Sequence, residues 1–132
     1  AAFSQMPAYM HRSLLKAYLQ TAAHRPLSAE AMDVYCAPWL GPVGQPAFYR
    51  QIAQMDQKYT DEVQSLYSAI DCPVTVLWGE KDDWIPYEQG ETLAALISGR
   101  ACVPVRDAGH LVQEDRPEAI VAAVLKQIAV RR

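Results

Sequence analysis

The apolar pattern of this chain changes near residue 72, and that change limits the folds open to it. Before it, apolar side chains recur every three or four residues between turns that contain Pro, which is typical of amphipathic helices. After it, residues 74–78 are a continuous β-branched and aromatic run that ends at Gly79, as in a parallel strand buried on both faces. We therefore predict helices alone over residues 1–71 and an α/β arrangement over residues 72–132.

Four helices are expected before residue 72. The first helical pattern ends before Pro26, where a helix does not readily continue. Gly and Pro residues favour a loop over residues 39–44. The helices are expected over residues 10–19, from the N-cap Ser28 to residue 37, over residues 47–55, and from the N-cap Thr60 to residue 70.

Strands and helices alternate in the rest of the chain. A helix is expected over residues 87–97 and a shorter strand over residues 101–105. Asp115 or Arg116 is expected to cap the last helix. Because Pro104 cannot donate a ladder hydrogen bond, the second strand is expected at a sheet edge. The order strand, helix, strand, helix predicts one right-handed crossover in a parallel sheet.

The charge balance and the cysteine count exclude several classes of protein. With 12 Lys and Arg against 15 Asp and Glu, the formal charge of −3 offers no basic field for nucleic acid or an anionic membrane surface. The apolar runs fall far short of the roughly 20 residues that a membrane span needs. Three widely spaced cysteines without a CxxC pair favour reduced thiols, so we expect a cytoplasmic protein with no nucleic-acid or membrane partner.

Reactive side chains follow both predicted strands. Asp82 lies in the loop after the first strand, and His110 lies in the loop after the second. The carboxyl ends of neighbouring parallel strands meet at one edge of a sheet, where ligands gather, so the acid is expected to reach the imidazole. A carboxylate bound to one ring nitrogen would fix the tautomer and leave the other nitrogen as a base.

Other polar residues are expected to have structural roles. Asp83 is more simply a solvated turn carboxylate, and Asp107 a turn former rather than a second acid. His11 and His24, on predicted helices, lack metal-ligand spacing and are expected in packing or surface roles. Residues 114–116 are expected to be the solvated start of the last helix. Aromatic residues of the first part are more often core than the lining of an apolar substrate cavity.

Two segments of the second part resemble the α/β-hydrolase family. Residues 73–82 (PVTVLWGEKD) look like its acid segment, and residues 107–118 (DAGHLVQEDRPE) look like its His segment. The resemblance implies that Asp82 is the acid of a G-x-x-D pattern and that His110 is the catalytic His. It also implies a fold class: the C-terminal portion of an α/β-hydrolase sheet, with residues 1–71 as the helical cap or lid inserted ahead of the acid strand.

The family nucleophile has no counterpart in this sequence. It lies in a G-x-S-x-G elbow, and none of the six serines here has glycines two residues before and two after it. Cys102 lies in an apolar strand and is expected to be a structural thiol. Because two strands leave a bare edge, we expect this chain to be the C-terminal part of a longer hydrolase. Residues 74–78 would then pair with the missing N-terminal half or with a second copy of the chain.

The resemblance implies a hydrolase of ester-like or related small organic substrates. The nucleophile, supplied by the missing half, would attack, His110 would transfer protons, and water would release the intermediate. No cofactor and no metal is required. An upstream serine in an elbow would indicate an enzyme instead of an inactive relic, and an aspartate there would indicate dehalogenase or epoxide-hydrolase chemistry. An acyltransferase on the same fold and a catalytically inactive interaction module are the alternatives.

Overall fold

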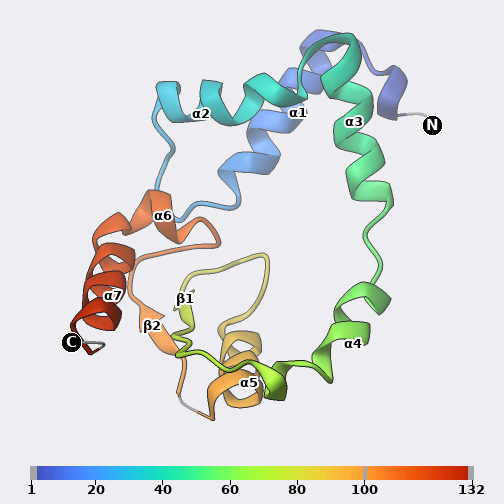
Figure 1. Cartoon of the computed structure of the whole chain (residues 1–132). Coiled ribbons are helices and arrows are strands. Elements are labelled where there is room, and N and C mark those ends of the chain that lie inside the picture. The colour runs from blue at the N-terminus through green and yellow to red at the C-terminus, as the bar shows by residue number, and fades with distance from the viewer. Residues whose placement is uncertain (1–2, 100, 131–132) are drawn as a thin grey trace.

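The computed structural model describes residues 3–99 and 101–130 (Figure 1). The first part contains helices α1 (Ala8–Gln20), α2 (Ala29–Cys36), α3 (Gly41–Ala53) and α4 (Lys58–Gln64), with 3₁₀ turns η1 (Phe3–Gln5), η2 (Ala37–Trp39) and η3 (Tyr67–Ala69). The second part contains β1 (Leu77–Gly79), α5 (Tyr87–Ser98), β2 (Val103–Val105), α6 (Val112–Asp115) and α7 (Pro117–Val130). We call residues 3–71 the helical region and residues 72–130 the α/β region.

The helical region has a small core of its own between α1, α2 and α3. The side chains buried in it are Leu15, Met32, Cys36 and Phe48. His11 is also buried, with Nδ1 3.0 Å from the Tyr49 hydroxyl and Nε2 2.8 Å from the Trp39 carbonyl oxygen. Because a carbonyl oxygen only accepts, Nε2 donates and Nδ1 accepts from Tyr49. The expected packing role of His11 is confirmed.

The beginnings of α2 and α3 test two expectations. Ser28 caps α2 as predicted, since its hydroxyl oxygen accepts from the backbone N–H three residues on, at 3.1 Å. The predicted loop over residues 39–44 is wrong, because α3 already begins at Gly41 with a proline in its first turn. Gly44 allows this start, since a Cβ there would lie 2.4 Å from the Pro38 carbonyl oxygen.

The last predicted helix of this region is shorter and less buried than its pattern indicates. Thr60 is not its N-cap, because α4 begins at Lys58, whose backbone N–H donates to the Asp56 carboxylate at 3.1 Å. The helix ends at Gln64 instead of residue 70. A helix this short depends on packing, and the described residues leave its apolar stripe uncovered. The exposed members of the stripe are Val63, Leu66 and Ile70.

β1 and β2 form a parallel pair, as predicted, with Leu77 opposite Val103. Both strands are shorter than the predicted runs of residues 74–78 and 101–105. The expectation that the first run is buried on both faces is wrong for this chain, since Thr75 is exposed. A ladder extends only as far as its partner, and a two-stranded sheet gives each strand a single partner.

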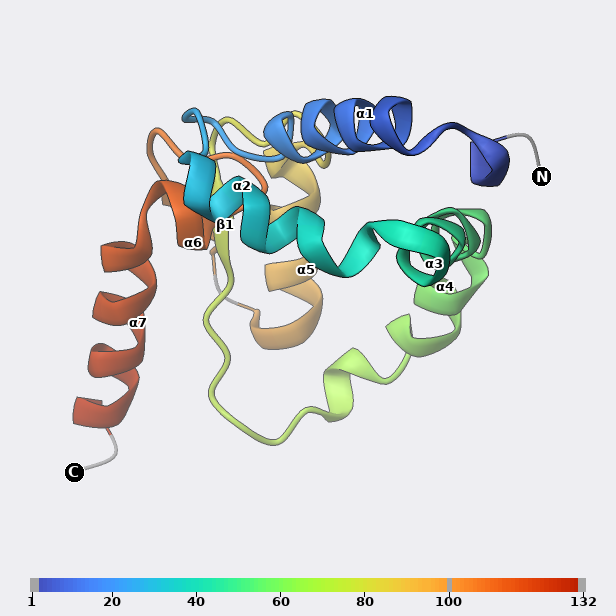
Figure 2. The ribbon, with the colours of Figure 1, turned by 90° about the horizontal axis from the view of Figure 1, so that it is seen from above.

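α5 and α7 lie on opposite sides of the two strands (Figures 1 and 2). Trp78 packs so closely on α5 that a Cβ at Gly90 would lie 2.6 Å from its ring. On the other side, Thr75 and Leu77 line a pocket together with Ile120 of α7. The sheet is therefore covered by one helix on each face. Within the described residues, no helix combines the length and the apolarity needed to cross a membrane.

Candidate active site

The loops that follow β1 and β2 are hydrogen-bonded to each other where the strands end. The backbone N–H of Glu80 donates to the Val105 carbonyl at 3.0 Å, and that of Lys81 donates to the Ala108 carbonyl at 2.9 Å. Gly79 permits this approach, because a Cβ there would lie 2.4 Å from the same Ala108 oxygen. The side chains of the two loops are thus brought to one edge of the sheet.

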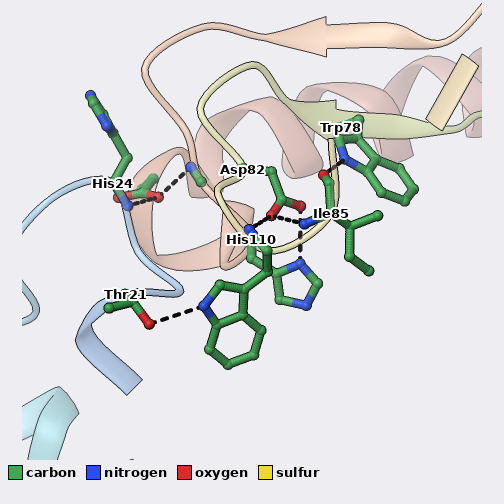
Figure 3. Close-up of polar contacts among 9 residues, drawn as sticks. Thr21, His24, Trp78, Asp82, Ile85 and His110 are labelled. Atoms are coloured by element: carbon green, nitrogen blue, oxygen red, sulfur yellow. Dashed lines mark hydrogen bonds and ion pairs between the residues drawn. The ribbon is translucent and has the colours of Figure 1, made fainter. Parts of the chain in front are cut away.

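Asp82 and His110 face each other across these loops (Figure 3). Nδ1 of His110 lies 3.0 Å from Oδ2 of Asp82, and Oδ1 of Asp82 accepts from the backbone N–H groups of Trp84 and Ile85, each at 2.9 Å. The Asp82 side chain is only 3% exposed, whereas that of His110 is 32% exposed. Because an ionised carboxylate only accepts, Nδ1 carries a proton, and in the neutral imidazole Nε2 then presents its lone pair. The structure brings the two residues together, and their catalytic roles stay predictions.

The neighbouring candidates do not join this pair. Asp83 is exposed, as expected of a solvated turn carboxylate. Asp107 adopts a φ of +52°, which Asp tolerates, and its Oδ2 lies 2.7 Å from the Arg116 guanidinium, so its turn role is confirmed. Burial raises the pKa of the Cys102 thiol, which fits a structural residue better than a nucleophile.

Trp84 connects the pair to the helical region, and the sequence analysis did not single it out. Its ring lies against the His110 ring, with centroids 5.0 Å apart, and against the Tyr18 ring of α1, with centroids 4.6 Å apart. Its indole N–H donates to the Thr21 hydroxyl at 3.0 Å (Figure 3). In the sequence, only its position two residues after Asp82 could have indicated that Trp84 lies near the pair.

Asp115 corrects the expectation of a solvated helix start. It ends α6, a short helix that the pattern did not predict, and it does not cap α7, which begins at Pro117. Its side chain is buried and accepts from the backbone N–H groups of Gly109, His24 and Arg25, each at 2.8 Å. Burial raises the pKa of Asp115, but these donors outweigh it and lower the pKa overall.

His24 does not lie on a helix as expected, but in the turn that follows α1. The His24 residue is exposed there, in agreement with the expected surface role. The contact with Asp115 is made by its backbone N–H. Figure 3 shows the imidazole of His24 pointing away from the His110 pair.

A groove of about 690 Å³ lies away from the His110 pair, between the strands and α7. The residues that line it include Val76, Val105, Arg106 and Lys126. Neither Asp82 nor His110 lines it. Among the described residues, no group of three or more His, Cys, Asp or Glu side chains could hold a metal ion.

The fold and the sequence identify the family. A model of the alpha/beta hydrolase family matches residues 2–123, which is most of the chain. This chain belongs to the alpha/beta hydrolase family. The fold class expected from the sequence is confirmed.

Individual relatives agree with this assignment. An alpha/beta hydrolase fold protein from Burkholderia ambifaria superimposes with a TM-score of 0.91 and 54% identity, over 95% of this chain and 46% of that one. A putative lipase (lip1) from Acinetobacter baumannii AYE has the same fold, with a TM-score of 0.68 and 19% identity over 96% of this chain and 47% of that one. The uncharacterized hydrolase YugF of Bacillus subtilis (strain 168) is 40% identical over 48 residues, 36% of this chain and 18% of that protein. This chain spans about half the length of the two solved structures.

Proposed function

We propose that this chain supplies the acid and the base of a hydrolase acting on ester-like or related small organic substrates. The observation that carries the proposal is the contact between His110 Nδ1 and the buried carboxylate of Asp82. Two backbone N–H groups hold that carboxylate in place, so it is positioned to orient the imidazole. This is the acid and base part of a nucleophile, His and acid triad.

His110 acts as the proton carrier in this mechanism. Asp82 keeps the proton on Nδ1, so with a serine nucleophile Nε2 takes the hydroxyl proton and later gives it to the leaving group. The Asp82 carboxylate stabilises the imidazolium that forms in between. Water then attacks the covalent intermediate, with Nε2 again acting as the base, and releases the acid product.

The nucleophile comes from outside these 132 residues. None of the serines stands in a G-x-S-x-G elbow, and this chain spans 46% of the Burkholderia protein. A serine elbow in the remaining part gives an acyl-enzyme and esterase chemistry. An aspartate in that place gives an alkyl-enzyme ester and hydrolysis of halides or epoxides.

The helical region is the cap over the site in this proposal. The turn after α1 reaches the His110 pair through Trp84, whose indole N–H donates to Thr21 and whose ring packs on Tyr18. A substrate that approaches Nε2 of His110 would therefore lie near these aromatic rings. Their apolar surface suits a small organic substrate with an apolar group.

The proposed partner is the remaining half of the same protein, or a second copy of this chain, bound along residues 74–78. This run has no charge, and the groove of about 690 Å³ lies beside it. Pairing there would satisfy backbone groups that the short ladder leaves unpaired and would cover apolar side chains. Sedimentation of the 132-residue chain should show a dimer or larger species, and a dilute, monodisperse monomer would contradict this.

The test of the proposed function uses the longer protein and a p-nitrophenyl ester. His110→Ala should reduce kcat/KM by about 10³-fold or more, and Asp82→Asn by about 10²-fold or more through loss of tautomer control. Asp83→Asn, which removes an exposed neighbouring carboxylate, is the matched control and should change little. Equal losses at Asp82 and Asp83 would show that the acid is wrongly assigned.

The 132-residue chain itself should not hydrolyse the ester. Its pair of Asp82 and His110 has no nucleophile to activate. Turnover by the purified chain that a serine-directed reagent abolishes would overturn this expectation. Turnover by the longer protein that survives His110→Ala would overturn the proposed mechanism.

A further inference from the structure

The Asp115 carboxylate joins two segments that lie about 90 residues apart in the sequence. Oδ2 accepts from the backbone N–H groups of Gly109 and His24, each at 2.8 Å (Figure 3). Oδ1 accepts from the backbone N–H of Arg25, also at 2.8 Å. Gly109 belongs to the loop that carries His110, whereas His24 and Arg25 belong to the turn after α1. One buried side chain thus ties the helical region to the loop of the proposed base.

Both chain neighbours of His110 are bonded into this connection. Gly109 donates to Asp115, and Leu111 donates through its backbone N–H to the Ala22 carbonyl at 2.9 Å. The two backbones approach so closely that a Cβ at Gly109 would lie 2.8 Å from the His24 nitrogen. The main chain of His110 is therefore held on each side by contacts with the same turn.

The same turn also contacts the ring that lies against His110. Thr21 accepts from the indole N–H of Trp84 at 3.0 Å, and the Trp84 ring packs on the imidazole. The Trp84 backbone N–H in turn donates to Asp82 at 2.9 Å. A shift of the turn would consequently reach His110 through its backbone and through Trp84.

We propose that Asp115 is a positioning residue that locks the turn of residues 21–25 to the His110 loop, and so fixes the cap and the imidazole relative to Asp82. The effect of Asp115 on turnover rests on the proposed function, whereas its structural role does not. The hydrogen-bonded connection of residues 21–25 to the His110 loop through Asp115, which we call the Asp115 lock, is present in the 132-residue chain and is testable without activity.

The lock requires a carboxylate. Three donors converge on it, and an ionised carboxylate has two oxygens that only accept. An asparagine keeps one of these oxygens and directs an NH₂ group at a backbone N–H. At least one of the three bonds is therefore lost, and that backbone N–H is left with neither a protein acceptor nor water. The lowered pKa of Asp115 agrees with an ionised group at neutral pH.

The first experiment compares Asp115→Asn with two matched controls by NMR of the 132-residue chain. Asp107→Asn removes an exposed carboxylate from the same loop, and Tyr35→Phe removes a surface bond between α2 and α6, from Tyr35 to Glu114 at 2.8 Å. In Asp115→Asn alone, amide exchange at Gly109, His24 and Arg25 should accelerate at least tenfold, with a shift of the Trp84 indole signal. Unchanged exchange at these amides would overturn the proposal.

A second measurement needs no substitution at Asp115. In the unmodified chain, the Asp115 carboxyl carbon and the amide protons of Gly109, His24 and Arg25 should titrate with one shared midpoint. His24, whose charge also acts on Asp115, is replaced by Gln in a parallel sample to separate its effect. Amide signals that do not follow the Asp115 carboxyl would contradict the lock, even if Asp115→Asn does not fold.

Kinetics of the longer protein separate positioning from a merely structural role. Asp115→Asn should lower kcat per folded enzyme about tenfold, and this loss should shrink in an Asp82→Asn background, because both act on the same imidazole. A purely structural Asp115 would lower the folded fraction and leave kcat per folded enzyme unchanged. If the unmodified longer protein has no turnover, the proposed function fails. The two NMR measurements still test whether Asp115 joins residues 21–25 to the His110 loop.

Discussion

The helical region and the α/β region of this chain differ in the apolar core that each one buries. The helical region closes an apolar core around the fully buried Leu15. The α/β region buries the carboxylates of Asp82 and Asp115, while α7 leaves apolar side chains more than half exposed. Those exposed side chains are Val121, Val124, Leu125 and Ile128.

The Asp82–His110 pair lies in the α/β region, and hydrogen bonds of the surrounding loops hold it. The Asp82 carboxylate is held by backbone N–H groups of its own loop, and His110 is held by the turn of the helical region. Hydrogen bonds of these loops, together with the Trp84 ring, therefore position the pair. The strands contribute mainly by bringing the two loops to one edge.

The largest expected effect contrasts the two apolar surfaces directly. Leu15→Ala should lower the free energy of unfolding by about 3–4 kcal/mol, whereas Leu125→Ala at the exposed face of α7 should cost less than about 0.5 kcal/mol. Urea denaturation followed by circular dichroism measures both. A cost at Leu125 that matches the cost at Leu15 would break the comparison, because it would mean that α7 is covered by a partner.

The next effect tests the junction between the regions. Asp115→Asn should lower the free energy of unfolding at neutral pH by about 2–3 kcal/mol, since buried N–H groups lose their acceptor. Asp107→Asn, at an exposed carboxylate, is the control and should cost much less. Chemical denaturation of both variants at pH 7 measures the difference, and equal costs would contradict the importance of the buried acceptor.

The stability contribution of Asp115 should also depend on pH. Because the folded state lowers its pKa, the carboxylate stabilises the fold fully above the unfolded-state pKa of about 3.9. The contribution is lost as the pH falls through the lower pKa of the folded state. The difference in unfolding free energy between the unmodified chain and Asp115→Asn should thus narrow below about pH 4. A difference that stays constant under acid would show that the ionised group is not responsible.

A smaller effect on the free energy of unfolding is expected where the His110 loop meets the turn after α1. Gly109→Ala should cost about 1–3 kcal/mol, because its Cβ would lie 2.8 Å from the His24 nitrogen and the turn would have to move. Gly99→Ala places a Cβ in open space at a φ of +62°, and so isolates the cost of the backbone conformation. Thermal unfolding of the two variants separates clash from strain, and a smaller cost at Gly109 than at Gly99 would show that the turn adjusts freely.

The smallest effect concerns a helix end within the helical region. Ser28→Ala should lower the free energy of unfolding by about 1 kcal/mol, because the backbone N–H in the first turn of α2 loses its acceptor. Ser13→Ala is the control, since the Ser13 hydroxyl donates to the Tyr9 carbonyl on the exposed surface of α1. Urea denaturation of the two variants should show a cost at Ser28 alone.

Local patterns predicted the parts of this protein that local forces form. The Ser28 cap, the parallel order of strand and helix, and the two loops that hold Asp82 and His110 each follow from residues that act within a few positions of one another. The same patterns failed where packing decides. The loop expected at residues 39–44 became the start of α3, and the expected strand of residues 74–78 formed its ladder only from Leu77 onward.

The sequence by itself determined the order of the two strands and of the longer helices around them, the family, and which loops carry an acid and a histidine. Only the tertiary structure decided that Asp115 is buried and that Trp84 lies between Tyr18 and His110. The bond between Asp115 and the His24 backbone joins residues 91 positions apart, and backbone N–H groups are present at almost every residue. Nothing in a local pattern selects one such donor, because the choice is made only when the two regions pack against each other.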